Sequence, residues 1–145
     1  MTPEICVALL ATISCGFIDA RTGFIPNRIT YPALGVILVL AALLHRLDSA
    51  ALGALCVGGT LALLYMLTLG RGTGLGDVKL AACIGAGFGP HCGMVALLSS
   101  FIAGGLFGAW LFYAGRAGRK TPIRFGPFLA AGSLFALALQ LQMLQ

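Results

Sequence analysis

The segment Gly70-Arg-Gly-Thr-Gly-Leu-Gly-Asp-Val-Lys79 separates two apolar runs and carries one carboxylate, Asp77. Its glycines alternate from Gly70 to Gly76, a pattern that disfavours a rigid helix and favours a backbone that approaches another segment closely. A second acid, Asp19, ends an earlier apolar run in Phe17-Ile-Asp-Ala-Arg-Thr-Gly-Phe-Ile-Pro-Asn27. The whole chain has only four acidic residues. Because two of these four acids lie at the margins of apolar runs, we predict that Asp19 and Asp77 form a functional pair.

The composition is that of a protein embedded in lipid. Of the 145 residues, 59% are hydrophobic and 9% are charged, whereas soluble domains are about 45–50% apolar and about 25% charged. A bilayer accepts an apolar outer surface, and it requires every backbone polar group to be satisfied internally. We therefore expect one integral membrane domain over residues 1–145, with an all-α fold.

Six apolar segments are candidates for transmembrane helices, at residues 4–18, 30–44, 50–69, 78–88, 93–114 and 128–144. The fourth is shorter than the ~17–25 residues of a usual crossing and is rich in glycine. We expect it to tilt, to thin the bilayer locally, or to extend through the Gly-Pro connection that follows. The first run lacks the basic N-terminal region of a signal peptide, so we interpret it as a retained helix.

The basic residues predict the orientation of the six helices. With the N-terminus outside, eight of the nine fall at the cytoplasmic connections or their margins: Arg21, Arg28, Arg71, Lys79, Arg116, Arg119, Lys120 and Arg124. Only Arg46 falls outside, as the positive-inside rule expects. Asp19 and Asp77 then share the cytoplasmic side, and Glu4 and Asp48 lie on the other side.

Two carboxylates held close together cannot comfortably both ionise, so they share a proton and titrate as a pair. Such a pair hydrolyses peptides: the ionised member takes a proton from water, and the protonated member stabilises the oxyanion. The alternative is that each acid merely pairs with a nearby Arg or Lys as an interfacial anchor. Phosphate binding is disfavoured, because the glycine segment ends in Gly-Asp and not in the Gly-Lys-Ser/Thr of a Walker loop.

Metal, cofactor and nucleic-acid chemistry have little support in the sequence. The five cysteines form no C-x-x-C pair and are interpreted as packing residues. His45 and His91 lie in separate predicted connections, so we expect no metal site and no cofactor. The dispersed basic residues favour membrane topology over nucleic-acid binding. Small residues at helix-packing spacing, such as Gly104 and Gly108, favour packing within the bundle and leave a homo-oligomer open.

Taken together, Asp19 and Gly74-Leu-Gly-Asp77 on six apolar segments resemble the type IV prepilin peptidases, membrane aspartic proteases with a G-x-G-D motif. Further similar stretches are Ile25-Pro26-Asn27 after Asp19, Asp77-Val-Lys79-Leu-Ala-Ala, and Phe125-Gly-Pro-Phe-Leu-Ala130. The resemblance implies that Asp19 and Asp77 are catalytic. It implies supporting roles for the motif residues Gly74, Gly76, Lys79, Pro26 and Asn27.

The resemblance also implies substrates and a location. The substrates would be prepilins or pseudopilins of type IV pilus, secretion or competence systems, each with a short basic leader that ends in glycine and precedes a hydrophobic helix. Cleavage would occur at the cytoplasmic face of the bacterial inner membrane. The longer members carry an N-terminal segment with C-x-x-C pairs that is linked to methylation. This sequence lacks that segment, so we expect a short form without methyltransferase activity.

The sequence leaves several roles open. Asp77 begins its helix and Asp19 ends its own, so the helix dipole favours Asp77 as the ionised base by only ~0.3–1 kcal/mol. Pro26 and Asn27 are expected to start and cap the second helix, and Lys79 either orients Asp77 or anchors its helix. An ion-coupled transporter and a non-catalytic assembly subunit are the competing functions.

Overall fold

The computed structural model describes residues 2–70, 73–115 and 124–143, and all its regular structure there is helical. The elements are α1 (Pro3–Thr22), α2 (Asn27–Leu43), α3 (Leu47–Gly53), the π-helical turn η1 (Ala54–Gly58), α4 (Gly59–Leu67), α5 (Leu75–Tyr113) and α6 (Gly126–Gln142). The all-α prediction is therefore confirmed for this part of the chain.

Three helical segments are long and apolar enough to cross a membrane: Pro3–Thr22, Leu47–Leu67 and Leu75–Tyr113. Two shorter apolar helices, Asn27–Leu43 and Gly126–Gln142, accompany them. Large apolar side chains such as Leu10, Leu55 and Leu106 are more than two-thirds exposed, which suits a surface that faces hydrocarbon. These features indicate a membrane protein.

The predicted fourth and fifth segments lie in one element, α5, which is interrupted at Gly89. This residue has φ 78° and ψ 175°, a conformation that is essentially restricted to glycine. Pro90 follows and has no N–H to lose at the break. The connection that we predicted between residues 88 and 93 is thus a sharp kink at Gly89. His91, which we expected in that connection, lies in the helix that follows the kink.

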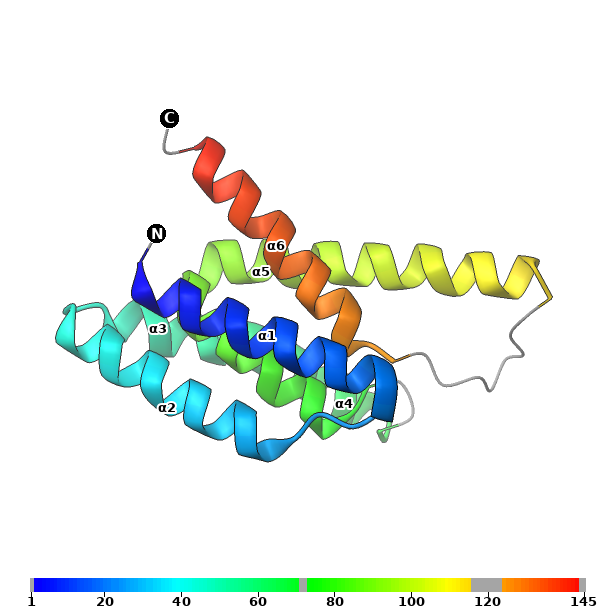
Figure 1. The fold of residues 1–145 in the computed structure, drawn as a ribbon, viewed down its shortest axis with the longest axis horizontal. Helices are drawn as coiled ribbons and strands as arrows, with labels where there is room; N and C mark the ends of the chain where they lie inside the picture. The colour runs from blue at the N-terminus through cyan, green and yellow to red at the C-terminus, as the bar shows by residue number, and fades with distance from the viewer. Residues whose placement is uncertain (1, 71–72, 116–123, 144–145) are drawn as a thin grey trace.

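At the kink the second part of α5 turns back past the first, as Figure 1 shows. A Cβ atom added at Gly93 would lie 3.0 Å from the Cα atom of Gly85. In a straight helix, eight residues span about 12 Å. The two parts of α5, residues 75–88 and 90–113, are therefore separate helices in practical terms, packed against each other near Gly89.

The first part of α5 is the centre of the fold. Leu80, Ala81, Cys83 and Ile84 on it have no solvent exposure, and α5 contacts every other helical element that the structure describes. Helix α3 packs very closely on it, because a Cβ atom at Gly53 would overlap the carbonyl oxygen of Gly85. The small residues therefore serve close packing between helices of one chain.

The two ends of α1 carry different polar contacts. At its N-terminal end, the buried carboxylate of Glu4 lies 3.4 Å from the guanidinium of Arg46. Asp19 lies 15 residues later, about 22 Å along the helix axis. Glu4 and Arg46 therefore share one side of the bundle and Asp19 lies on the other, as the predicted topology requires.

Candidate active site

Asp19 lies in the last turn of α1, and its carbonyl oxygen accepts the N–H of Gly23, which ends the helix. Asp19 is only 5% exposed. The side-chain Oδ2 atom accepts a hydrogen bond from the backbone N–H of Gly126, with an N···O distance of 2.9 Å. The carboxyl group is thus held by a segment from the far end of the chain.

Asp77 lies in the first turn of α5, as its third residue, and is 8% exposed. Its Oδ2 atom accepts the backbone N–H of Gly74 at 2.9 Å. A capping box has two hydrogen bonds, in each of which the side chain of one residue accepts the backbone N–H of the other. Gly74 is the N-cap residue and has no side chain, so only the bond from its N–H to Asp77 can form. The carboxylate satisfies an amide that would otherwise be left unpaired at the start of the helix.

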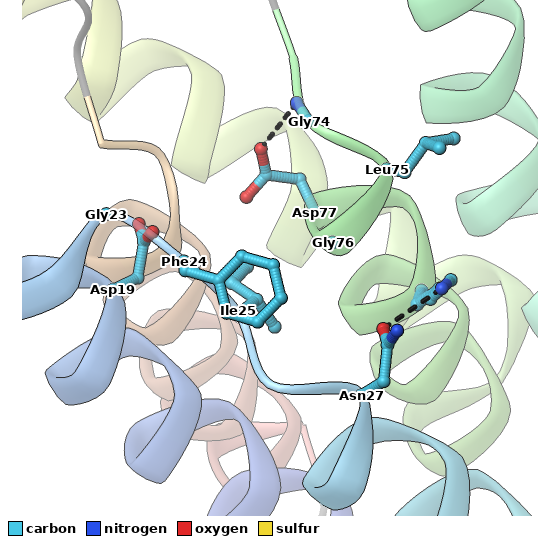
Figure 2. Close-up of a pocket in the computed structure, with 10 residues that line it drawn as sticks. Asp19, Gly23, Phe24, Ile25, Asn27, Gly74, Leu75, Gly76 and Asp77 are labelled. Carbon is cyan, nitrogen blue, oxygen red and sulfur yellow. Dashed lines mark hydrogen bonds between the residues drawn. The ribbon is translucent and has the colours of Figure 1, made fainter.

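Both carboxyl groups line one cavity of about 340 Å³ (Figure 2). The cavity walls come from the end of α1, the loop to α2, and the start of α5. The lining residues are Asp19, Gly23, Phe24, Ile25, Asn27, Gly74, Leu75, Gly76, Asp77 and Lys79. At about 30 Å³ of liquid volume per water molecule, the space would hold roughly ten waters or a short stretch of peptide.

The two motif glycines differ in their surroundings. A Cβ atom at Gly76 would lie 2.8 Å from the Cβ atom of Ile25, so the α1–α2 loop packs directly on this backbone position. At Gly74, the nearest atom outside its neighbours would be Asp77 Oδ2 at 3.4 Å, an ordinary contact. The close approach that the alternating glycines predict therefore occurs at Gly76.

This difference predicts unequal effects of alanine at the two positions. Gly76→Ala should displace the Ile25 loop from the cavity wall and lower kcat about tenfold or more, because misplacement on the order of 1 Å can cost about 10² in rate. Gly74→Ala should lower it less than about threefold. Cleavage of a peptide substrate by the purified variants measures both effects. Equal losses, or a larger loss for Gly74→Ala, would contradict this account of the motif.

Lys79 contacts α2 and not the neighbouring carboxylate. Its Nζ atom donates to Asn27 Oδ1 at 3.0 Å and lies 4.7 Å from the centre of the Tyr31 ring, a cation–π contact. Figure 2 shows the Asn27 side chain at the cavity, with a dashed line for this hydrogen bond. Of the two expected roles, this contact favours an anchor between α5 and α2.

The predicted capping role of Asn27 is wrong. Pro26 is the N-cap residue of α2 and Asn27 is its first residue, and the structure has no side-chain hydrogen bond at this cap. The Asn27 amide oxygen accepts a hydrogen bond from Lys79 instead. Pro26 has φ −73°, a value its ring enforces, and it thus sets the direction in which α2 begins.

The interfacial-anchor alternative is not supported by the ion pairs. In the ranges 2–70, 73–115 and 124–143, neither Asp19 nor Asp77 has a basic nitrogen within 4.0 Å. The guanidinium of Arg21 lies over the Phe17 ring instead, at 4.2 Å. Arg71, a further basic residue close to Asp77 in the sequence, lies outside the described residues. The same described ranges contain no group of three His, Cys, Asp or Glu residues that could hold a metal ion.

Sequence reasoning missed the contact between the start of α6 and Asp19. The Phe-Gly-Pro stretch starts a helix, with Phe125 as the N-cap residue of α6, and the structure also brings the amide of Gly126 onto Asp19. It also missed Arg124, whose Nη1 atom donates to the carbonyl oxygen of Ala20. The resemblance pointed to the Phe-Gly-Pro stretch, but no local pattern indicated which residue it would contact.

Comparison with known proteins identifies the family. Residues 6–109 match the type IV leader peptidase family. The chain is also 37% identical, over 125 residues, to the leader peptidase HopD of Salmonella typhimurium strain LT2, and the match covers 79% of each chain. This chain belongs to the type IV leader peptidase family. The matched region contains both Asp19 and Asp77 and ends before α6.

Other relatives in the type IV leader peptidase family are longer. The chain is 36% identical over 141 residues to the prepilin leader peptidase/N-methyltransferase of Burkholderia pseudomallei strain 1026b, covering 92% of this chain and 44% of that protein. The protein of the same description from Bacillus subtilis strain 168 is 39% identical over 121 residues, covering 81% and 48%. The chain thus spans less than half the length of these two relatives. No solved structure matches it significantly.

Proposed function

We propose that this protein is a membrane aspartic endopeptidase that removes the short leader of type IV prepilins or prepilin-like proteins. The observation that carries the proposal is the single cavity lined by two buried carboxyl groups from different helices, Asp19 and Asp77. Membership of the leader peptidase family supports the reaction class and the class of substrate. The methyl transfer named in the two longer relatives is not part of this proposal.

The arrangement of oxygen atoms supports a mechanism that uses one atom of each carboxyl group. Each Oδ2 atom already accepts a backbone N–H, from Gly126 and Gly74 respectively. In the described part of the chain, no protein donor forms a hydrogen bond to either Oδ1 atom. The two Oδ1 atoms are therefore the ones left for the shared proton and for the attacking water.

Hydrolysis then proceeds through a tetrahedral intermediate. The ionised carboxylate takes one proton from water as the water oxygen bonds to the scissile carbonyl carbon. The protonated carboxyl group gives its proton to the carbonyl oxygen. When the intermediate collapses, the C–N bond breaks, the leaving nitrogen takes the proton held by the first carboxyl group, and the second regains its proton from the intermediate.

The geometry removes the reason for assigning the base to Asp77 alone. That hypothesis rested on the position of Asp77 at a helix start and of Asp19 at a helix end. Asp19, however, accepts an amide from the first turn of α6, so both carboxyl groups face the positive end of a helix. We assign the base and acid roles to the pair and not to its individual members.

We also propose six membrane crossings with the cavity at the cytoplasmic face. The crossings are α1, α2, the run Leu47–Leu67, the two parts of α5, and α6. The kink at Gly89 supports the division of α5, and the distribution of basic residues supports an external N-terminus. This arrangement would present the pair to a leader on the cytoplasmic side of the inner membrane.

Cleavage of a defined substrate tests the function. The purified protein, in detergent or in lipid vesicles, is incubated with a peptide that has a basic leader ending in glycine, followed by a hydrophobic helix. Mass spectrometry should find one cut after that glycine, and none in a peptide whose glycine is replaced by a bulky residue. Folded protein that cuts no member of a panel of such peptides would refute the proposal.

A further inference from the structure

Asp19 is positioned by a residue 107 places later in the chain. We infer that the start of α6 is a third part of the active site, in which Gly126 is the positioning residue for the Asp19 carboxyl group. This inference deepens the proposed function and rests on it. Figure 1 shows the start of α6 beside the end of α1, where Asp19 lies.

The first turn of α6 has one amide available for Asp19. Pro127 has no N–H, and the amides of Phe128 and Leu129 both donate to the carbonyl oxygen of Phe125. The N–H of Gly126 is thus the remaining donor of that turn, and it donates to Asp19 Oδ2. A hydrogen bond to one oxygen atom restricts the rotation of the Asp19 carboxyl group about its Cβ–Cγ bond.

Only glycine fits at this position. A Cβ atom on residue 126 would lie 2.7 Å from Asp19 Oδ2 and 2.8 Å from its Cβ atom. From the other side, a Cβ atom on Gly16 would lie 3.1 Å from the Gly126 carbonyl oxygen and 3.1 Å from Ala130. The backbones of α1 and α6 therefore approach each other directly beside the carboxyl group, with no side chain between them.

Two contacts hold the start of α6 in place. The guanidinium of Arg124 donates to the carbonyl oxygen of Ala20, in the last turn of α1, where helix carbonyls lack partners within the helix. The Phe125 ring packs on Phe101 of α5, with 5.0 Å between ring centres. Because Arg124 and Gly126 both contact α1 within one turn of Asp19, they hold the start of α6 against the end of α1.

A single-site infrared measurement tests the positioning directly. The chain has three aspartates, at positions 19, 48 and 77, so the double variant Asp48→Asn/Asp77→Asn leaves Asp19 as its only one. Side-chain ¹³C-labelled aspartate, introduced by cell-free synthesis, then reports on this carboxyl group alone. Adding Gly126→Ala should shift the labelled carboxyl band, because the added methyl group displaces the amide from Oδ2. Adding Gly35→Ala should not, since a Cβ atom there meets nothing within 4 Å.

Kinetics in the otherwise unchanged chain give the second readout. Gly126→Ala should lower kcat about 100-fold, the scale expected for a misplaced catalytic group, with KM within about twofold. Gly35→Ala should change neither value. If Gly126→Ala does not fold, Arg124→Ala should produce the same band shift and a smaller loss in kcat, with partial rescue by Arg124→Lys, which keeps a donor.

The two readouts separate this inference from the proposed function. The infrared band needs no peptidase activity, so it tests the Gly126–Asp19 contact even if the substrate proposal fails. Folded Gly126→Ala protein with an unchanged band and unchanged kcat would overturn the inference. If neither the unmodified protein nor any variant cleaves the peptide, that result would count against the proposed function alone.

Discussion

The Asp19→Asn and Asp77→Asn variants should each cleave the substrate about 10³-fold more slowly or worse. A positioned acid or base contributes about 10²–10⁴-fold to the rate. Asparagine has nearly the volume of aspartate, and its amide oxygen can still accept the N–H that Oδ2 accepts from Gly126 or Gly74. It cannot take up a proton from water. The fold should therefore be kept while the reaction is lost, as measured by initial rates on a prepilin-like peptide.

Asp48→Asn is the matched control for this prediction. Asp48 is exposed and lies at the start of α3, on the side of the bundle that carries Arg46, so its variant should cut at the rate of the unmodified protein. The double variant Asp19→Asn/Asp77→Asn should be no worse than either single one, because residues that act as a unit are not additive. A single variant with more than about a tenth of full activity would remove that aspartate from the mechanism.

Gly53→Ala and Gly85→Ala should each give a large loss of stability. A Cβ atom at either position would overlap the backbone carbonyl oxygen of the other residue. Backbone cannot move aside as the end of a flexible side chain can. We therefore expect the free energy of unfolding to fall by about 3 kcal/mol or more, at or above the upper end of the range of about 1–3 kcal/mol for an overpacked core.

Thermal unfolding in detergent, followed by circular dichroism, measures this effect. Gly59→Ala is the matched control, because it lies in the same helical run as Gly53 and a Cβ atom there meets nothing within 4 Å. It should be neutral or should stabilise the protein by up to about 1 kcal/mol through higher helix propensity. Equal midpoints for Gly53→Ala and Gly59→Ala would show that α3 and α5 are less closely packed than the structure indicates.

Much of the architecture follows from local patterns in the sequence. Apolar runs predicted helices wherever the structure has them, since a helix in lipid satisfies its own backbone and needs no partner for that purpose. The boundaries were less accurate: the third run begins at Leu47 and ends at Leu67, not at 50 and 69. The Gly89–Pro90 pair predicted a break between two helices, but not that the break is a kink of one residue.

The candidate site was predicted in part. Asp19 and Asp77 stood out because acids are rare in this chain and costly near lipid. The contacts of Lys79 with Asn27 and Tyr31 were not predicted, because they join α5 to α2 and a charged side chain has several possible partners. Asn27 was assigned to a cap on residue type alone, and the competing bond to Lys79 could not be seen in the sequence.

The sequence by itself determined that this is an all-helical, lipid-compatible chain with two acids at the margins of its apolar runs, because composition and periodicity are local properties. Only the tertiary structure decided which backbone amides reach those acids and which glycines are required. Gly126 meets Asp19 across 107 residues, and Gly53 meets Gly85 between two different helices. Such contacts depend on how helices are placed in space, and no short-range pattern of residues encodes that placement.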